Sequence, residues 1–563
     1  MRILPGLTRR TILTETVSGV TLLAIAVPLN IGYAQIAGLP PTAGLYSLIL
    51  PCVVFALLAS TRQLVASPDA AAAALVASSL GGLAAAGSAD YITMALAQAI
   101  IGGAMFAACA LFKLGFLANF LSEPILVGFV GGLALDILVS QVAKMLGVHI
   151  DSGAEFLDKL GQLITGLGGV NGWSVIIAIG SIAVLLGGRV LARRVPWALI
   201  VLIVTTVIVV LTGLEQRGVS VLGPVQAGPP SLAWPVLSWA TWAQLVPSAA
   251  ALTLVAMAEG LLVARKYGQK RGYTTNPNRD LLAFGASNLA AGVSGGFTVG
   301  SSTSRTAALD QVGSRTQLPS IITAAGTLVL VIFGTGLLEH IPSPAIGAIV
   351  GVAVVPLLGI REFTEIWKVN RFEFVVGAVC FLATLLLGPI IGIVLAFVLS
   401  LINLALRASR PAVDLLSEND IPGGSLLPLE PDHFITAPGV AVVRFAAPLF
   451  FANASIFDST IRAVVNGGED KGLRHVVLDC EAITDIDVTG AASYREVREW
   501  VTSRQITFDL SRVRPDLAAL LTQLNLVGTS TIYGTNRQAL AALVPTGEHA
   551  DAAGAETGKH RQH

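Results

Sequence analysis

About a dozen apolar windows, several of them long enough for a membrane-spanning helix, fill the first 406 residues of this chain. A helix needs about 20 apolar residues to cross the hydrocarbon core of a bilayer. Only 12% of the residues are charged, whereas soluble domains carry about one quarter. The pattern predicts an all-α polytopic membrane domain over residues 1–411. The windows lie at residues 17–37, 42–60, 92–112, 123–146, 173–191, 196–214, 246–264, 280–293, 318–338, 343–359, 372–388 and 389–406.

Two further segments, residues 68–82 and 301–312, are too short or too polar to cross a membrane alone. Each begins with a cluster of Gly, Ser or Pro, and each occupies a similar place in its half of the domain. Counting both gives about 14 membrane segments in two sets of seven, and paired interrupted segments of this kind are typical of transporters.

Basic residues gather in alternate joints between the windows, a bias that marks the cytoplasmic side of a membrane protein. The opposite joints hold little beyond Lys159 and Arg217. We therefore predict a multi-pass protein of the inner (plasma) membrane with both termini in the cytoplasm, its first window retained as a span. The basic positions are Arg2, Arg9, Arg10, Arg62, Lys113, Arg189, Arg193, Arg194, Arg265, Lys266, Lys270, Arg271, Arg279, Arg315, Arg361, Lys368, Arg371, Arg407 and Arg410.

The composition becomes that of a soluble domain after about residue 411. Apolar strand patterns at residues 440–445, 475–479 and 506–510 alternate with helical patterns at 454–465, 489–503, 514–524 and 537–543. We predict a small cytoplasmic α/β domain over residues 412–546, followed by a polar, disordered tail over residues 547–563.

Several classes of function receive no support from the sequence. The net charge is zero, which argues against nucleic-acid binding, and the four cysteines show no disulfide or metal-ligand spacing. A nucleophile elbow and a Walker motif are both missing, so we predict no enzyme activity, no metal and no cofactor.

The two interrupted segments predict an ion site at the middle of the bilayer. In the first, Ser67 suits a helix cap and Pro68 the first helical position. In the second, glycines precede a hydroxyl cluster, and a helix is expected to start near Ser302–Ser304. Two helix N-termini that meet in a membrane would offer unpaired N–H groups and about half a positive charge each, which favours an anion. The alternative is a pair of kinked packing joints.

Three ionisable residues lie in or beside these segments. An intramembrane Arg such as Arg305 costs about 2.5–3.5 kcal/mol to insert, so it usually has a partner or a function. Arg305 would bind the anion or form a structural ion pair. Glu259, in an otherwise apolar window, is either a functional carboxylate or the static partner of Arg305. Asp69 is either functional or an acid favoured by the helix dipole alone.

A charge count links these residues to proton coupling. Arg305 and two dipole ends contribute about +2, which two ionised carboxylates would cancel. Protonation of one carboxylate restores net positive charge. We therefore predict proton-coupled anion uptake, with Glu259 as the main proton carrier and Asp69 as a second candidate.

Several ordered motifs resemble the sulfate permease (SulP) family, also called solute carrier family 26. The resemblance covers about residues 10–545. In the membrane domain it rests on Ser18–Thr21, Pro28, Tyr33-Ala34, Ala37–Pro41, Gly44–Tyr46, Ser60–Gln63, Pro68–Ala70 and Ser301–Thr316. In the soluble domain, Pro448–Ala454, Val477–Cys480 and Thr484–Ala491 look like the family's STAS (sulfate transporter and anti-sigma factor antagonist) domain.

The resemblance implies a seven-plus-seven inverted repeat with core and gate domains, a homodimer, and elevator-type alternating access. It also implies a substrate site between the third and tenth segments. Carried over by position, that site contains Tyr33, Asp69, Ala70, Glu259, Ser302, Thr303, Ser304 and Arg305.

The chain departs from the family pattern at three places. Position 69 is often apolar or hydroxylic in the family but is acidic here, which argues against simple anion-channel behaviour. Leu29 stands where a Gln is common, and Asn30 is the nearby amide. Sodium-coupled bicarbonate members of the family resemble an Asp-x-x-x-Thr pattern in this segment. Here Glu259 takes the place of the Asp and Val263 that of the Thr, and an apolar side chain cannot help to coordinate Na⁺.

Thr489 aligns with the phosphorylated serine of bacterial anti-sigma antagonists. It is a candidate regulatory site, which a cytoplasmic protein partner of the STAS domain could read, or a plain helix cap.

The function predicted first is secondary active transport of a small anion, sulfate or a similar oxyanion, by symport with protons. The alternatives are a bicarbonate or dicarboxylate carrier of the same family, an uncoupled anion channel, and a membrane-anchored signalling protein whose STAS domain acts.

Overall fold

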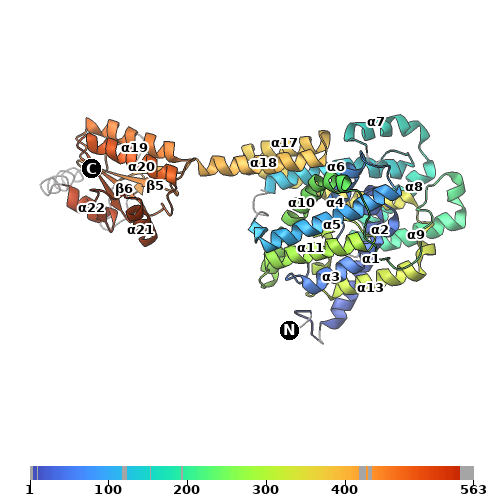
Figure 1. Ribbon diagram of the computed structural model, residues 1–563. Helices are drawn as coiled ribbons and strands as arrows, with labels where there is room; N and C mark the ends of the chain where they lie inside the picture. The colour runs from blue at the N-terminus through green and yellow to red at the C-terminus, as the bar shows by residue number, and fades with distance from the viewer. Residues whose placement is uncertain are drawn as a thin grey trace, which may run out of the picture. The chain divides into compact units, whose positions relative to one another are not determined.

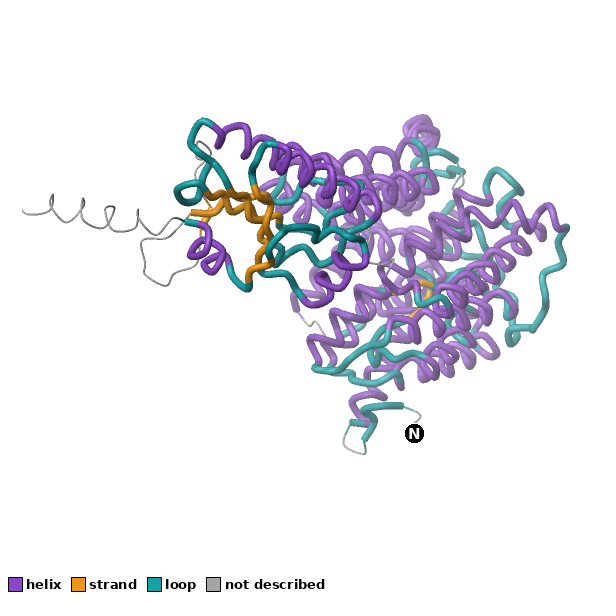
Figure 2. The backbone as a smooth tube through the Cα atoms, turned by 60° about the vertical axis from the view of Figure 1, so that its left-hand side comes forward, coloured by secondary structure: helices purple, strands orange, loops and turns teal. Residues whose placement is uncertain are grey.

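The computed structural model describes residues 4–8, 11–116, 123–151, 154–191, 195–417, 427–428 and 434–544. They group into two compact units, Met1–Ser400 and Leu401–His563. The first unit is almost entirely helical, and the second contains a six-stranded sheet (Figures 1 and 2). The tail expected at residues 547–563 and the basic positions Arg2, Arg9, Arg10, Arg193 and Arg194 lie outside the described residues.

The first unit contains two sets of helices, separated by a long connection between α9 and α10. The first set is α1 (Ile12–Ile36), α2 (Pro41–Tyr46), α3 (Leu50–Leu58), α4 (Ala70–Leu80), α5 (Ala89–Leu111), α6 (Glu123–Leu146), α7 (Phe156–Gly166), α8 (Gly172–Leu191) and α9 (Trp197–Thr212). The second is α10 (Trp239–Arg271), α11 (Pro277–Val293), α12 (Thr303–Val312), α13 (Leu318–Phe333), α14 (Thr335–Leu338), α15 (Ser343–Val354), α16 (Ile360–Val369), α17 (Arg371–Leu386) and α18 (Pro389–Ala408), whose last turns belong to the second unit.

Length and composition identify seven of the described helices as able to cross a bilayer, or eight if the bent pair at residues 156–188 is one span. The predicted segments outnumber these because several are short or interrupted. Helices α4, α9 and α13 are apolar but only 11, 16 and 16 residues long. Helix α12 has 10 residues and a polar sequence. With these helices and α11 and α17, which have 17 and 16 residues, each half contributes seven segments, as predicted.

The packing of the helices reveals an inverted repeat. Helix α1 packs against α13, and its counterpart α10 packs against α5. Likewise α1 contacts the half-helix α12, whereas α10 contacts the half-helix α4. Helices α5 and α11 lie side by side along their length (Figure 1). Pairings that recur with the two halves exchanged are those expected of a pseudo-two-fold axis.

Two groups of helices form within this unit. Helices α1, α3, α5, α10, α11 and α13 surround the two half-helices as a core, whereas α6, α8, α9, α15 and α17 pack together as a gate. Helices α1 and α4 of the core contact the gate. The half-helices therefore belong to one group of helices and face the other.

The second unit is the predicted small α/β domain. Its sheet has the order β4-β3-β5-β6-β7-β8, with β5 to β8 parallel and β3 antiparallel to both neighbours. Apolar side chains alternate between its two faces, one packed by α19, α20 and α21 and the other by α22. The strands are β3 (Val413–Ser417), β4 (Leu427–Pro428), β5 (Val440–Phe445), β6 (His475–Asp479), β7 (Thr507–Ser511) and β8 (Ile532–Tyr533). The helices are α19 (Ala454–Glu469), α20 (Val488–Ser503), α21 (Pro515–Gln523) and α22 (Asn536–Leu543).

Three of the six strands in this sheet were not predicted. Strands β4 and β8 have two residues each, and β3 has an antiparallel partner that lies about 30 residues away in the sequence. Such short or edge strands carry too few residues for a clear alternation of apolar and polar positions.

Candidate functional site

A two-stranded sheet brings the two interrupted segments together. Strand β1 (Ala66–Ser67) pairs antiparallel with β2 (Gly300–Ser301), and α4 and α12 begin within three residues of these strands. Two further bonds fix the pairing: the Ser302 amide donates to the Val65 carbonyl (3.0 Å), and the Val65 amide donates to Thr306 Oγ1 (3.1 Å). Because both helices start from one small sheet, their N-termini lie next to each other.

The first half-helix begins two residues later than predicted. Asp69, not Ser67, is the cap of α4: its Oδ1 accepts a hydrogen bond from the Ala72 amide at 2.7 Å. The predicted cap at Ser67 is wrong because this residue is paired with Gly300 in the sheet, and Pro68 precedes the cap instead of opening the helix. The second helix begins where predicted, with Ser302 as its cap.

The loop before β2 is held by side chains from other helices. Asn288 of α11 donates from Nδ2 to the Val299 carbonyl and accepts from the Val299 amide, both at 2.9 Å. Ser47 Oγ accepts from the Phe297 amide at 3.0 Å. Neither residue stood out in the sequence, since single polar residues in apolar helices give no local signal of a distant partner.

Among the described residues Arg305 is the largest fully buried side chain, and it links the two half-helices. Its Nε donates to Ser302 Oγ at 2.8 Å, and Nη2 donates to the Pro68 carbonyl just before α4. Its guanidinium carbon lies 5.7 Å from the centre of the Tyr33 ring. The other terminal nitrogen, Nη1, is buried and has no hydrogen-bond partner.

Glu259 lies beside the second half-helix but does not pair with Arg305. Its Oε1 accepts from Thr303 Oγ1 at 3.1 Å, and among the described residues Arg305 has no acidic partner within ion-pair distance. The predicted alternative, a static ion pair between Arg305 and Glu259, is therefore wrong. The buried cation and the membrane carboxylate both remain candidates for a function.

The site has an open and a closed side. Thr303 and Ser304 are exposed, and Asp69 and Glu259 are half-buried. Tyr33, Ala70, Ser302 and Arg305 are buried. All eight predicted residues come from α1, α4, α10 and the start of α12, which the structure brings to one place. Asn30 does not join them through its amide nitrogen, which donates to Ala26 within α1 (2.9 Å).

Because residue 300 is a glycine, the backbone of strand β2 can lie directly against the Asp69 carboxylate. A Cβ added to Gly300 would lie 2.8 Å from Asp69 Oδ2, closer than real contacts allow. The sequence carries no signal for this role of Gly300, because a close approach between distant segments is decided by the tertiary structure.

We expect Gly300→Ala to displace the Asp69 side chain and weaken the cap of α4. Loss of a cap costs about 0.5–2 kcal/mol, so the thermal transition of the purified protein should fall, and substrate binding should fall with it. Gly336→Ala is the matched control, because nothing lies within 4 Å of an added Cβ there. Equal behaviour of the two variants would contradict this role of Gly300.

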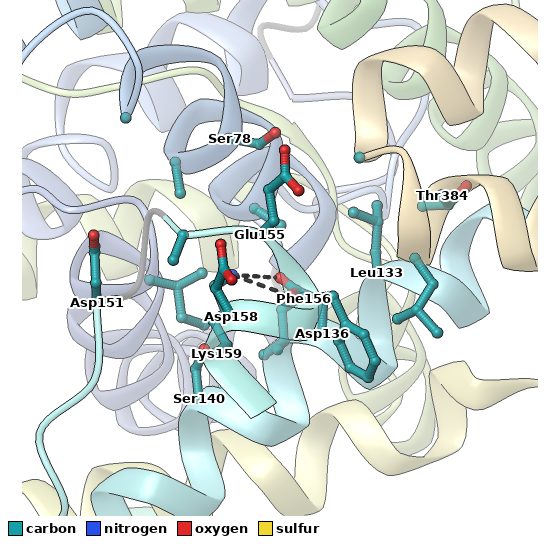
Figure 3. A pocket seen from close by; sticks show the side chains of 18 of the residues that line it. Ser78, Leu133, Asp136, Ser140, Asp151, Glu155, Phe156, Asp158, Lys159 and Thr384 are labelled. Carbon is teal, nitrogen blue, oxygen red and sulfur yellow. Dashed lines mark hydrogen bonds and ion pairs between the residues drawn. The ribbon is translucent and has the colours of Figure 1, made fainter. Parts of the chain in front are cut away.

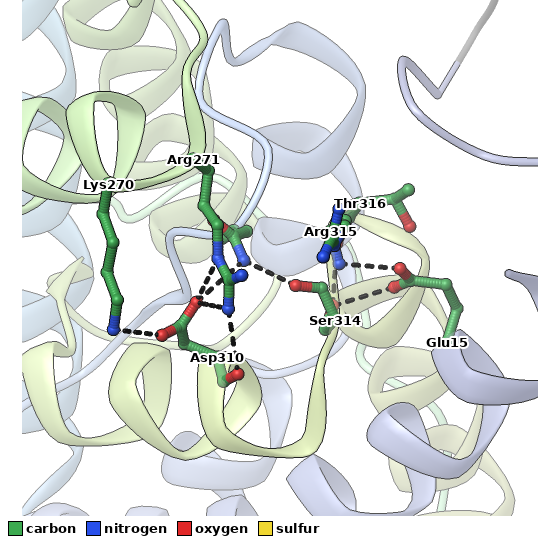
Figure 4. A network of polar contacts seen from close by, with 8 residues as sticks. Glu15, Lys270, Arg271, Asp310, Ser314, Arg315 and Thr316 are labelled. Atoms are coloured by element: carbon green, nitrogen blue, oxygen red, sulfur yellow. Dashed lines mark hydrogen bonds and ion pairs between the residues drawn. The ribbon is translucent and has the colours of Figure 1, made fainter.

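The C-terminal end of α12 is anchored by a polar network (Figure 4). Asp310 accepts from Lys270 Nζ and from Arg271 Nε, both at 2.7 Å, which joins α12 to the end of α10. Glu15 of α1 accepts from Ser314 Oγ (2.8 Å) and from the Arg315 amide (2.7 Å). The network fixes the half-helix at the end opposite to its N-terminus.

A separate cavity of about 470 Å³ lies between α4 of the core and α6 of the gate. Lys159 of α7, expected in a loop, lines it and pairs with Asp136 of α6, with Nζ 2.8 Å from Oδ2 (Figure 3). Lys144 Nζ donates to Gln35 Oε1 at 2.9 Å and thereby joins the gate helix α6 to the core helix α1. Because the cavity is lined by the far half of α4, it lies beyond the site along the same helix.

The fold and the site define a class of protein: a multi-pass membrane protein with an inverted repeat, two half-helices whose N-termini meet, and an α/β domain at the C-terminus. Comparison with known families identifies it further. The sulfate permease family matches residues 12–380, and the STAS domain matches residues 434–539. The chain belongs to the sulfate permease family.

Relatives and solved structures agree with this assignment. A probable sulfate transporter of Mycobacterium tuberculosis is 33% identical over 542 residues, which cover 95% of this chain and 96% of the relative. Sulfate transporter 3.1 of Arabidopsis thaliana is 26% identical, with 92% and 81% covered.

The murine solute carrier 26 family member A9, an anion transporter in the inward-facing state, superposes with a TM-score of 0.85 at 20% identity, covering 95% and 92% of the two chains. The transmembrane domain of a cyanobacterial bicarbonate transporter gives 0.59 at 22% identity, with 71% and 99% covered. At these identities the solved structures establish the shared fold.

Proposed function

We propose that this protein is a secondary transporter that carries a small oxyanion, sulfate or a similar ion, together with protons. The observation that carries the proposal is the buried Arg305 between two adjacent helix N-termini, with one terminal nitrogen unpartnered. Support also comes from relatives named sulfate transporters. The first turns of α4 and α12 would supply amide donors, and Arg305 a charged donor, to the bound anion.

Proton coupling would follow from the two carboxylates beside the anion. Asp69 and Glu259 are half-buried and belong to helices that meet at the site. When both carboxylates are ionised, their negative charge about balances the positive charge of the two helix N-termini and Arg305. Protonation of Glu259 would leave net positive charge for the anion, so the two ligands would favour each other's binding.

Alternating access would arise from movement of the core relative to the gate. Both half-helices belong to the core, and the polar network at Asp310 ties α12 to α10 of the same group. The site would therefore move as a unit past α6, and the Lys144–Gln35 contact between the gate and the core would have to open. We propose an elevator-type motion in a homodimer, with both termini in the cytoplasm.

Reconstitution into liposomes tests the function directly. Radiolabelled sulfate, bicarbonate, succinate and nitrate would be offered separately, with and without an acid-outside pH gradient. We expect sulfate uptake that the gradient accelerates. Uptake of bicarbonate or succinate alone would establish the alternative carriers, and uncoupled single-channel currents would establish a channel.

Thr489 is the proposed regulatory position of the STAS domain. The helix cap of α20 is Asp487, whose Oδ1 accepts from the Gly490 amide at 2.7 Å, so the cap function considered for Thr489 is wrong. Thr489 lies in the first turn of α20, and its side chain is exposed. A phosphoryl group there would add about two negative charges at a helix N-terminus, a favourable place for an anion. Phosphopeptide mapping of the protein purified from its own cells checks this assignment.

A further inference from the structure

An apolar cleft of about 940 Å³ opens on the surface of the gate, between α6, α16 and α17. Four aromatic side chains line it: Phe363, Trp367, Phe374 and Phe381. Thr364 is the one polar residue of the lining. A cleft of this size with almost no polar groups suits a hydrocarbon and offers nothing to a hydrophilic ligand.

The sequence of α16 explains one wall of the cleft. Ile360, Phe363 and Trp367 repeat at spacings of three and four residues and share one face, whereas the charged residues lie on the rest of the helix. No residue of α16 is buried, and Ile360 and Trp367 are 72% and 47% exposed. Phe363 and Trp367 contact aromatic rings of α17, but part of this apolar face stays uncovered by the described protein, as in helices that lie in a membrane interface.

The length of the cleft matches part of a lipid chain. Its lining runs from Phe374 near the start of α17 to Leu382, which is about 12 Å along the helix. On the opposite wall it reaches Leu135, close to the middle of α6. Since the hydrocarbon core is about 30 Å thick, the cleft extends from the interface toward the middle of the bilayer.

Two cations stand at the interfacial end. Lys368 follows the cleft residue Trp367, and the guanidinium carbon of Arg371 lies 5.4 Å from the centre of the Trp367 ring. Within the described residues, neither Lys368 nor Arg371 has an acidic partner at ion-pair distance, whereas Arg361 is paired with Glu365 at 3.1 Å.

Three acids belong to the same region. Glu362 lies on the face of α16 away from the cleft, Glu365 is paired with Arg361, and Glu373 follows in the first turn of α17. On the helical wheel, Lys368 is the charged residue of α16 nearest to the apolar stripe. The mouth of the cleft is therefore basic although the region as a whole is close to neutral.

This end of the bundle is also the end rich in basic loops. A Cβ added to Gly377 of α17 would lie 2.8 Å from the Pro124 carbonyl at the start of α6. The chain before α6 passes the start of α11, where Gly115 approaches Pro277 near Arg279. Basic loops mark the cytoplasmic side, whose leaflet carries the anionic lipids.

We propose that this cleft binds an anionic phospholipid, with an acyl chain between α16 and α17 and the headgroup phosphate held by Lys368 and Arg371. Two donors at the mouth would select the charge of the headgroup, and the aromatic walls would hold the chain. A second copy of this chain is the competing occupant; a concave apolar cleft would need a matching protrusion on that copy, whereas acyl chains surround the protein in the membrane.

Native mass spectrometry of the purified full-length protein tests the proposal. The protein would be reconstituted with equal amounts of phosphatidylglycerol and phosphatidylcholine and then extracted. We expect one retained phosphatidylglycerol, with a preference of about 10-fold over phosphatidylcholine. The double variant Lys368→Gln/Arg371→Gln should lose this preference, whereas Arg361→Gln, at a cation already paired with Glu365, should keep it.

Two further variants fill the cleft with a larger side chain. Ala378→Phe blocks it near the aromatic walls and Leu382→Phe at its deep end, and each should remove the retained lipid of both kinds at an unchanged thermal transition. If one of these variants fails to fold, the other still tests whether the lipid occupies the cleft. Equal retention of the two lipids by the wild-type protein would overturn the proposal, and so would an unchanged preference in the double variant. If the two cleft-filling variants dissociate a dimer but keep the lipid, the proposal is overturned as well.

Discussion

Replacing Arg305 with alanine is expected to abolish anion binding, with affinity for labelled sulfate reduced about 100-fold or more. Loss of a buried charged donor to an anion costs roughly 3 kcal/mol or more, and each 1.4 kcal/mol is a factor of ten. Arg305→Lys should fail almost as completely, because one ammonium group cannot reach Ser302 Oγ, the Pro68 carbonyl and the anion together. Binding to the detergent-solubilised protein and uptake into liposomes measure the effect.

Folding and binding must be separated for this residue, since Arg305 also joins the two half-helices. A thermal transition recorded for each variant reports folding, and Arg265→Gln, at an exposed position of α10, is the matched control. A folded Arg305→Ala protein that still binds sulfate with wild-type affinity would exclude the proposed site.

The second large effect concerns Glu259. We expect Glu259→Gln to transport sulfate at a rate that no longer responds to an imposed pH gradient, while exchange of internal for external sulfate continues. The amide can still accept from Thr303 Oγ1 but cannot carry a proton. The measurement compares uptake with and without an acid-outside gradient for the wild-type and variant proteins.

Glu123→Gln, at an exposed position at the start of α6, is the control for this substitution and should keep the wild-type response. Asp69→Asn separates the two carboxylates. Its side-chain oxygen can still cap α4, so a loss of gradient response here, with Glu259→Gln unaffected, would transfer the proton role to Asp69.

The relation between these variants follows from their places in the site. Arg305 is buried between the helix ends, whereas Glu259 is half-buried and hydrogen-bonded to the exposed Thr303. We therefore expect Arg305 to govern affinity for the anion, and Glu259 to govern the coupling between anion and proton. A single variant that changed both properties equally would argue against this division.

Much of the architecture was accessible from the sequence because hydrophobicity and helix-breaking residues act locally. A run of about 20 apolar residues has few alternatives to a membrane helix, so the segments and their two-fold arrangement were predicted. Gly, Pro and hydroxyl residues at Pro68 and Gly295–Ser302 likewise marked, to within two residues, where helices begin inside the membrane domain. The rarity of charge in apolar windows selected Arg305 and Glu259.

Only the tertiary structure decided how these residues pair. The register of β1 against β2 joins positions more than 230 residues apart, and it removes Ser67 from the cap of α4 and leaves Asp69 there. The same packing places Thr303 where its hydroxyl donates a hydrogen bond to Glu259, and it leaves Nη1 of Arg305 without a hydrogen-bond partner. Local propensity determines where helices form and which residues are costly to bury, but the choice of a hydrogen-bond partner depends on distances that exist only after the two halves have packed.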